Sequence, residues 1–386
     1  MPDTFWHGIT IGCLALTACG CAYALAATAL VRRFTRDGAP TATAFPGISI
    51  LKPLHGAEAT LYDNLRSFCD QDYAGPVQLL FGVQNADDPA IAIVDRLVAE
   101  RPGHDIQLLV TTHPRGPNPK VANLAGLQRH IRHDVVVLSD SDVAVERDHL
   151  SRTVAALDQP GVGLVTCLYR GEAQRGFWAR LASMAIDYHF LPGVLVGLRL
   201  GLARPCFGST IALRRELLAA IGGFDAFLDQ LADDNAIGEA VRAHGMRVAI
   251  PPFVVVHACP EQSAAELLRH ELRWARTLRA VSPSGYAGLA ITHPLPFAIL
   301  GAWTSGSGAL GASVIAAAIG CRLVLQRQVD HTLHVSPSRW WLGPPRDLLA
   351  FAVYVASFFV DVVNWRGHRY RVRPDGTLIP IGEPKG

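Results

Sequence analysis

The stretch Asp134-Val-Val-Val-Leu-Ser-Asp-Ser-Asp-Val-Ala-Val145 runs four apolar residues directly into two carboxylates, Asp140 and Asp142. A short apolar, β-branched run without helical periodicity is typical of a buried strand in a parallel sheet. In open α/β sheets, ligands bind at the carboxyl ends of such strands. Two carboxylates spaced two residues apart at that position supply the hard oxygen ligands that suit Mg²⁺ or Mn²⁺ bridging a diphosphate. Because Ser and Asp also favour turns, the pattern alone fits a plain turn equally well.

Strand and helix patterns alternate around this stretch. Short apolar runs predict strands at 47–56 (ending in a tight loop), 77–83, 106–111 and 134–139, and the intervening segments predict helices at 64–70, 88–100 and 118–130. An alternation of strand and helix every ~20–25 residues predicts a parallel, doubly wound sheet. Asp88 followed by Pro89 is a standard helix start, so a cap is the simplest interpretation of that carboxylate.

The second half of the chain is less regular. It predicts strands at 162–169, 207–214 and 247–256, and helices at 176–188, from 215 to Gly222-Gly223, at 231–242 and at 261–280. Asp233 and Asp234 fall in the first turn of a helix, where the helix macrodipole favours acidic residues. Arg273 and Trp274 lie inside the last helix, and on pattern alone they fit a solvated face with one aromatic in the core.

Composition narrows the class of protein. Half of the 386 residues are apolar and the mean hydropathy is +0.23, too apolar for an ordinary soluble enzyme. A formal charge of +2 and a pI near 8.2 are too mild to indicate nucleic-acid binding. The eight cysteines include no Cys-x-x-Cys pair, which favours small buried residues in a reduced compartment over disulfides or a zinc site. Composition does not determine the oligomeric state.

Gly8 to Val31 carries no charge and is followed by Arg32, Arg33 and Arg36. This predicts an N-terminal transmembrane anchor over 8–31, with the segment after it held in the cytoplasm by the positive-inside rule. A signal peptide cleaved near Ala24-Leu-Ala26 is disfavoured, because the preceding residues lack positive charge and the apolar run is too long.

Apolar segments return at about 288–303, 308–325 and 348–365, whereas 190–202 is interrupted by Pro192 and Arg199 and fits an interfacial segment. Basic residues after both the second and the third segment favour the cytoplasm, which three full crossings cannot satisfy. Pro294 and Pro296 make the first segment the candidate for an interfacial one. We therefore predict membrane or interfacial helices over 286–366, a basic cytoplasmic tail over 367–386, and a cytoplasmic catalytic domain over 45–282.

Six motifs follow one another in a recognisable order: Leu51-Lys-Pro-Leu-His-Gly56, Asp87-Asp-Pro-Ala-Ile91, Asn118-Pro-Lys120 with Asn123, Ser139-Asp-Ser-Asp142, Ala232-Asp-Asp234 and His270-x-x-Arg-Trp274. With Asn364-Trp-Arg-Gly-His-Arg-Tyr-Arg371 near the end, the chain resembles the ceramide glucosyltransferase family of membrane-bound inverting glycosyltransferases over nearly its whole length. It is most similar to the bacterial branch that includes the hopanoid-biosynthesis glycosyltransferases.

The resemblance implies a GT-A catalytic domain (Rossmann-like, with a mostly parallel sheet), a UDP-sugar donor, a membrane lipid acceptor, and Mg²⁺ or Mn²⁺ as cofactor in the inner (cell) membrane. It implies metal binding by Asp140 and Asp142, and catalysis by Asp234 as general base with Arg273, Trp274 and His270. Donor contacts are implied for Pro53, Asp88, Lys120, Asp140, Gly208 and Ser209. Two departures stand out: His270 replaces the Gln or Arg that usually opens the last motif, and Asp142 has no counterpart in the eukaryotic members.

The predicted reaction is transfer of N-acetylglucosamine to a hopanoid polyol, bacteriohopanetetrol, and the alternative is transfer of glucose from UDP-glucose to ceramide. These residue types suit direct displacement, because a metal and an Arg stabilise the departing diphosphate while a carboxylate accepts the alcohol proton. A non-catalytic nucleotide-sugar-binding scaffold would be favoured only had these carboxylates been lost. A transporter or a polysaccharide synthase would need more spanning segments than the chain provides.

Overall fold

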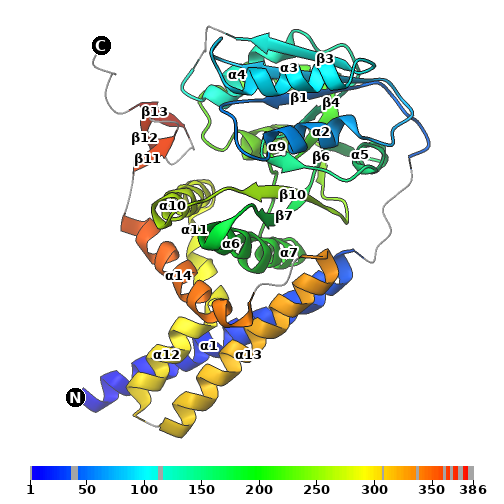
Figure 1. The fold of residues 1–386 in the computed structure, drawn as a ribbon. Helices are drawn as coiled ribbons and strands as arrows, with labels where there is room; N and C mark the ends of the chain where they lie inside the picture. The colour runs from blue at the N-terminus through cyan, green and yellow to red at the C-terminus, as the bar shows by residue number, and fades with distance from the viewer. Residues whose placement is uncertain are drawn as a thin grey trace. The chain divides into compact units, whose positions relative to one another are not determined.

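The computed structural model describes residues 2–35, 42–111, 116–306, 308–335, 339–359, 362–365, 368–372 and 377–380. They divide into two compact units (Figure 1). One, the helical unit, comprises Met1–Arg36, Arg170–Arg204 and Glu261–Val363, and the other, the sheet unit, comprises Asp37–Tyr169, Pro205–Pro260 and Asn364–Gly386. Each unit is described by itself below.

A seven-stranded sheet forms the centre of the sheet unit. Its strand order is β3-β2-β1-β4-β8-β6-β9. The strands are β1 (Ile48–Pro53), β2 (Val77–Val83), β3 (Asp105–Val110), β4 (Val135–Leu138), β6 (Val162–Thr166), β8 (Ile211–Arg214) and β9 (Arg247–Ala249). β1 pairs in parallel with β2 and β4, β2 with β3, and β6 with β9. Only β8 is antiparallel to its neighbours β4 and β6, so the sheet is mostly parallel.

Helices cover both faces of this sheet, which explains why its central strands read as continuous apolar runs. In β4, Val135 and Val137 belong to one buried cluster, whereas Val136 and Leu138 belong to a cluster on the opposite face. The first cluster includes residues of α2 (Leu61–Cys69), α3 (Ala90–Glu100) and α5 (His149–Leu157). The second includes residues of α4 (Pro119–Gln128), α8 (Arg215–Ala220), the 3₁₀ turn η2 (Phe224–Phe227) and α9 (Asp233–Ala243).

The remaining described strands form two small sheets of three strands each. The first has the order β5-β10-β7 and contains β5 (Val143–Ala144), β10 (Val254–Cys259) and β7 (Leu168–Ala173). β5 and β10 run antiparallel, with His257 opposite Val143. The second has the order β11-β12-β13 and contains β11 (Val362–Trp365), β12 (His368–Val372) and β13 (Leu378–Pro380). Much of the predicted basic tail, namely Gly367, 373–376 and 381–386, lies outside the described residues, as does Arg366 just before it.

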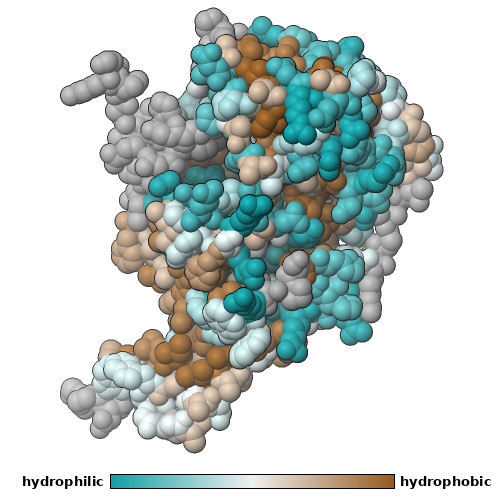
Figure 2. Space-filling view, viewed as in Figure 1, coloured by the Kyte–Doolittle hydropathy of each residue, from teal (hydrophilic) through white to brown (hydrophobic). Residues whose placement is uncertain are grey.

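The helical unit contains the long apolar segments. Its helices are α1 (Pro2–Phe34), α6 (Gly176–Ala185), the π-turn η1 (Ile186–Phe190), α7 (Leu191–Arg199), α10 (Ala264–Val281), α11 (Pro283–Gly288), η3 (Leu289–Thr292), α12 (Pro294–Ser305), α13 (Gly308–Leu333), η4 (Trp340–Leu342), α14 (Gly343–Ala356) and η5 (Ser357–Phe359). Within this unit, α1, α12 and α13 pack side by side (Figure 1). Pale to brown, weakly or strongly apolar residues dominate the visible surface over α12 and α13 (Figure 2).

Three helical segments among the described residues are long and apolar enough to cross a membrane: Thr4–Phe34, Gly176–Arg199 and Gly308–Leu333. The first and third agree with the predicted anchor and with the second predicted apolar segment. The prediction that 190–202 is a separate, broken segment was wrong, because α6, η1 and α7 form one continuous run. Pro192 is tolerated inside this run because the π-turn η1 precedes it and because the carbonyl of Tyr188, four residues before the proline, accepts a hydrogen bond from the Arg322 guanidinium at 3.1 Å.

Other boundaries differ from prediction. The segment predicted at 348–365 is helical only to Phe359, and its β-branched Val362-Val363 lies in β11. The strand predicted at 162–169 is two strands, because the chain turns at Cys167 from the large sheet into the small one. The strand predicted at 247–256 is also two strands, β9 and β10, in different sheets. α12 has only 12 residues, too few for a span, which is consistent with the prediction that this segment is the interfacial one.

Candidate active site

The polar residues of the sheet unit gather at the edge where β1 and β4 end. β4 stops at Leu138, and Asp140 follows two residues later. Because β8 runs antiparallel to β4, with Ile211 opposite Leu138, the segment before β8 lies at the same edge. The backbone N–H of Asp140 donates to the carbonyl of Gly208 at 3.2 Å, which ties the two segments together. The strand topology thus brings residues about 70 positions apart into one site.

Lys120 links two of the carboxylates. Its Nζ lies 2.8 Å from Asp140 Oδ1 and 3.2 Å from Asp233 Oδ2. Burial alone would lower the pKa of Lys120, but the nearby carboxylates of Asp140, Asp233 and Asp234 hold it above its usual value. Burial raises the pKa of Asp140, against the opposing effect of the Lys120 ammonium. Lys120 follows the N-cap Asn118, whose Oδ1 accepts the N–H of Val121 and whose Nδ2 donates to the carbonyl of Gln230, so α4 is anchored beside the approach to α9.

A second lysine lies beneath the Asp-Ser-Asp turn. Lys52, in the middle of β1, is fully buried, and its Nζ donates to the carbonyl of Asp140 at 2.7 Å and to that of Val143 at 3.4 Å. The ammonium also lies 3.9 Å from the centre of the Phe68 ring. Burial lowers the pKa of Lys52 to about 7, although the carboxylates of Asp142 and Asp140 act in the other direction. Lys52 therefore fixes the backbone that presents the two carboxylates.

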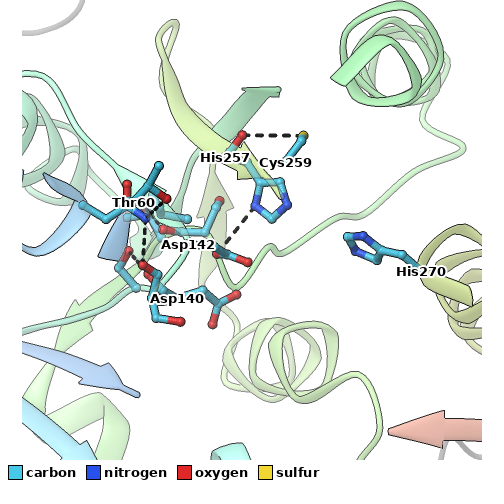
Figure 3. Close-up of polar contacts among 12 residues, drawn as sticks. Thr60, Asp140, Asp142, His257, Cys259 and His270 are labelled. Carbon is cyan, nitrogen blue, oxygen red and sulfur yellow. Dashed lines mark hydrogen bonds and ion pairs between the residues drawn. The ribbon is translucent and has the colours of Figure 1, made fainter. Parts of the chain in front are cut away.

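His257 approaches Asp142 from the neighbouring strand. The two strands β5 and β10 pair just after the turn, and the N–H of Ala258 donates to the carbonyl of Asp142 at 2.9 Å. This register places His257 Nδ1 3.5 Å from Asp142 Oδ1, as Figure 3 shows. The ring of His257 also lies against Tyr169, with 5.4 Å between centroids. The sequence analysis missed His257, although a single His after three valines of β10 resembles the way Asp140 follows β4.

Gly208 and Ser209 form the other wall of the site. A methyl group at Gly208 would lie 2.7 Å from Asp140 Oδ2 and 2.7 Å from Lys120 Nζ, so only glycine fits without displacing them. Ser209 is buried, and its hydroxyl donates to the carbonyl of Cys167 at 2.8 Å. Ser209 therefore shapes the loop, while Gly208 leaves space beside the carboxylates.

Asp234 lies at the start of α9 with both carboxylate oxygens bonded. Oδ2 accepts the N–H of Gly208 at 3.1 Å, and Oδ1 accepts that of Asn235 at 2.7 Å. Burial, followed by the charge of Asp233, raises the pKa of Asp234 to about 6. Asp233 is more buried and is paired with Lys120. With a pKa of about 6, Asp234 can exchange a proton near neutral pH.

Asp88 and Pro53 border the site at the first loop. Asp88 is buried, and its Oδ1 accepts the N–H of Gly56 at 2.9 Å and that of Ala90 at 2.9 Å. The carboxylate thus joins the loop after β1 to the beginning of α3, in agreement with its predicted capping role. Pro53 is the last residue of β1 and is buried. Gly56 has a φ of 74°, a conformation that favours glycine.

The remaining predicted site residues lie on α10, which belongs to the helical unit. Ser263 caps this helix by accepting the N–H of Glu266. His270 Nδ1 lies 2.5 Å from Oε1 of the buried Glu261, and its ring packs edge-on against Trp274 at 4.6 Å. Arg273 precedes this tryptophan. The structure therefore groups His270 with Trp274, and it groups the eight other predicted residues in the sheet unit.

The side chains at the sheet edge supply part of the ligand set that a divalent cation needs. Within the described ranges, no set of three His, Cys, Asp or Glu side chains is arranged to hold an ion alone. Asp142 and His257 still offer an oxygen and an imidazole nitrogen 3.5 Å apart, a donor set that Mn²⁺ accepts. Cations that serve nucleotides are commonly held by one or two protein ligands plus phosphate oxygens. The donors present therefore fit an ion whose other ligands come from a bound diphosphate.

The sequence profile described as "Glycosyl transferase family 21" matches residues 12–378. The chain belongs to glycosyl transferase family 21. Its relatives include ceramide glucosyltransferase 1 of Caenorhabditis elegans, 23% identical over 86% of this chain and 73% of that protein. Ceramide glucosyltransferase of Pyricularia oryzae is 21% identical over 94% of this chain and 92% of its own length. Their names favour the ceramide alternative over the hopanoid prediction, and membership of the bacterial branch is not shown.

Among solved structures, a mannosyltransferase from Pyrobaculum calidifontis in complex with GDP-Man and Mn²⁺ is similar to this family 21 chain. The TM-score is 0.53 at 22% identity, and the match covers 91% of this chain and 99% of the other. This likeness confirms the predicted GT-A-like α/β fold with a mostly parallel sheet. The protein is thus a glycosyltransferase with long apolar helices near its N-terminus and in its C-terminal region.

Proposed function

We propose that this glycosyltransferase transfers a hexose, with inversion, from a UDP-sugar to a hydroxyl of a membrane lipid. The observation that carries the proposal is the carboxylate cluster at the sheet edge, where Asp140 and Asp234 both contact Gly208 and Asp142 follows Asp140 by two residues. The names of the family relatives support glucose and a ceramide-like lipid as the substrates. Transfer of N-acetylglucosamine to a hopanoid polyol is the second outcome that the experiment below distinguishes.

In the proposed reaction, the lipid hydroxyl oxygen attacks the anomeric carbon on the face opposite UDP, and the bond between that carbon and the phosphate oxygen breaks. UDP leaves with the bonding electron pair. Asp234 accepts the hydroxyl proton, since a carboxylate with a pKa of about 6 is mostly ionised at neutral pH and still basic. Asp234 is preferred over Asp233 because the latter is paired with Lys120.

The other residues bind and orient the donor. Asp142 and His257, with Asp140, would hold Mg²⁺ or Mn²⁺, which neutralises charge on the diphosphate when bound. Lys52 holds the backbone carbonyl of Asp140, and Lys120 pairs with the carboxylate of the same residue. Asp88 orients the loop that would border the uridine.

The α10 residues Arg273, Trp274 and His270 would contact the donor, as the family motif implies. The basic residues after the predicted anchor support a cytoplasmic orientation of the catalytic domain.

A labelled transfer assay tests the proposal. Membranes from a host that makes neither lipid, carrying the full chain, are incubated with UDP-[¹⁴C]glucose or UDP-N-[¹⁴C]acetylglucosamine and with ceramide or bacteriohopanetetrol. We expect label in a product of ceramide and glucose that Asp234→Asn abolishes. Label only in the hopanoid would replace the ceramide assignment while leaving the mechanism intact. Label in neither lipid, with a folded protein that binds UDP, would refute the lipid-acceptor proposal.

A further inference from the structure

A cleft in the helical unit combines arginines with exposed aromatics. It has a volume of about 230 Å³ and lies between the beginning of α6 and η4, lined by Gly176, Phe177, Arg180, Arg339, Trp341 and Leu342. The guanidinium of Arg339 lies 5.9 Å from the centre of the Trp341 ring. Phe177 and Trp341 leave nearly half of their surfaces exposed, at 49% and 48%. Among the residues that the structure describes, no carboxylate lines the cleft.

The cleft lies where membrane-length helices end. Gly176 is the first residue of the candidate span Gly176–Arg199, and Arg339 follows the candidate span Gly308–Leu333 by six positions. Trp and Tyr concentrate at the boundary between hydrocarbon and water, and arginines beside membrane segments attract the negative headgroups of that layer. Both the position of the cleft and its residue types therefore agree with the headgroup layer.

The charge of the cleft specifies its occupant further. Arg180 and Arg339 are exposed, as is the adjacent Arg175, and within the described part of the chain none of the three pairs with an acidic side chain. The planar guanidinium group matches phosphate geometry with two parallel hydrogen bonds. The apolar walls, Phe177 and Trp341, suit the first carbons of a lipid rather than a fully hydrated ion.

We propose that this cleft binds the headgroup of an anionic phospholipid, with Arg180 and Arg339 on the phosphate and Phe177 and Trp341 against the glycerol and upper acyl chain. The proposed occupant is a lipid other than the acceptor, and neither arginine belongs to the proposed catalytic residues. Its volume accommodates a headgroup, while the acyl chains extend into the bilayer beside α6.

The test measures binding of fluorescent phosphatidylglycerol and phosphatidylcholine to the full chain purified in neutral detergent. For the double variant Arg180→Gln/Arg339→Gln we expect phosphatidylglycerol to bind at least about tenfold more weakly, since each arginine near an anionic lipid contributes roughly fivefold at low salt. Phosphatidylcholine binding should not change. The charge-retaining double variant Arg180→Lys/Arg339→Lys should keep most of the affinity for phosphatidylglycerol.

A matched control removes two arginines from helix ends of the same unit that do not line the cleft, in Arg32→Gln/Arg199→Gln. This variant should bind phosphatidylglycerol as the wild type does, and an equal loss would show general charge attraction and overturn the proposal. Displacement of the lipid by an equal concentration of glycerol 3-phosphate would also overturn it, because the site would then recognise a soluble phosphate. Unchanged thermal midpoints of the exposed-residue variants would confirm that they remain folded.

Discussion

Asp234→Asn is expected to make the protein inactive and at the same time more stable at neutral pH. The pKa of Asp234 rises from 3.8 to about 6, so the folded state holds this proton more tightly than the unfolded state. For such a raised carboxyl, stability is lost as the pH rises from about 4 through about 6, and the cost is complete above that range. An uncharged amide at this position avoids the cost.

The size of the effect follows from the shift and the contacts. A shift of about two pKa units corresponds to ~3 kcal/mol of folding free energy, an upper value. Asn keeps one carbonyl acceptor, so either the Gly208 N–H or the Asn235 N–H loses its partner, at a cost of about 1 kcal/mol. The net gain of about 2 kcal/mol corresponds to a midpoint roughly 4–8 °C higher for a domain of about 200 residues.

Thermal unfolding in detergent at pH 8 and at pH 4 measures this prediction. The variant should unfold at a higher temperature than the wild type at pH 8 and at a similar temperature at pH 4. Its UDP affinity should be retained, while sugar transfer falls on the order of 10²–10⁴-fold. Asp95→Asn, on the exposed face of α3, is the matched control and should leave the unfolding temperature, the UDP affinity and the transfer rate unchanged. A variant that is less stable at pH 8, or equally shifted at both pH values, would refute the buried-charge argument.

Three further predictions concern the donor site. Asp142→Ala, His257→Ala and EDTA should each abolish sugar transfer. Either substitution should also weaken Mn²⁺ binding in the presence of UDP by about tenfold or more, measured from the electron paramagnetic resonance signal of free Mn²⁺. Full activity in EDTA would exclude the metal role. Lys52→Met should lower kcat and the thermal midpoint, because it leaves the carbonyls of Asp140 and Val143 without their donor, and Lys52→Arg should not restore normal kcat in so confined a position. Arg273→Ala should weaken UDP binding itself, and an unchanged UDP affinity with slower lipid transfer would reassign this residue to the acceptor step.

The sequence predicted the large sheet because its strands are buried on both faces. A strand such as β4 is then a continuous apolar run, and its end is marked where the carboxylates begin. The errors concern element boundaries that the local sequence pattern does not mark. Cys167 does not break the apolar pattern, so nothing in the sequence marks the point where the chain passes from β6 to β7. Pro192 was interpreted as a helix breaker, although the run continues through it because Arg322, a residue distant in sequence, bonds the carbonyl of Tyr188 that the proline leaves without a donor.

The candidate site was predictable to the extent that its residues follow strands or start helices. Asp140 and Asp234 satisfy that condition and were identified, with their roles still to be tested. His257 was missed because its relation to Asp142 depends on the antiparallel register of β5 and β10, which no local pattern encodes. The role of Lys52 was missed too. A lysine inside an otherwise apolar strand indicates a nearby polar site, because an ammonium group is buried only where hydrogen-bond acceptors surround it.

The charges of the sheet edge explain why a cation belongs with the donor. Four carboxylates lie in this region, those of Asp140, Asp142, Asp233 and Asp234, whereas two lysines lie nearby. Lys120 pairs with Asp140 and Asp233, and Lys52, with a pKa of about 7, bonds the backbone carbonyl of Asp140. Negative charge is therefore in excess. A diphosphate that entered without a cation would be repelled by these carboxylates, because water and salt screen charges less in a buried site than at the surface. Lys120 cannot compensate the diphosphate fully, because Asp140 and Asp233 already engage its ammonium. In the proposed reaction, the same excess of negative charge that raises the pKa of Asp234 would favour a divalent cation accompanying the donor. Donor affinity and proton acceptance would then depend on one set of carboxylates.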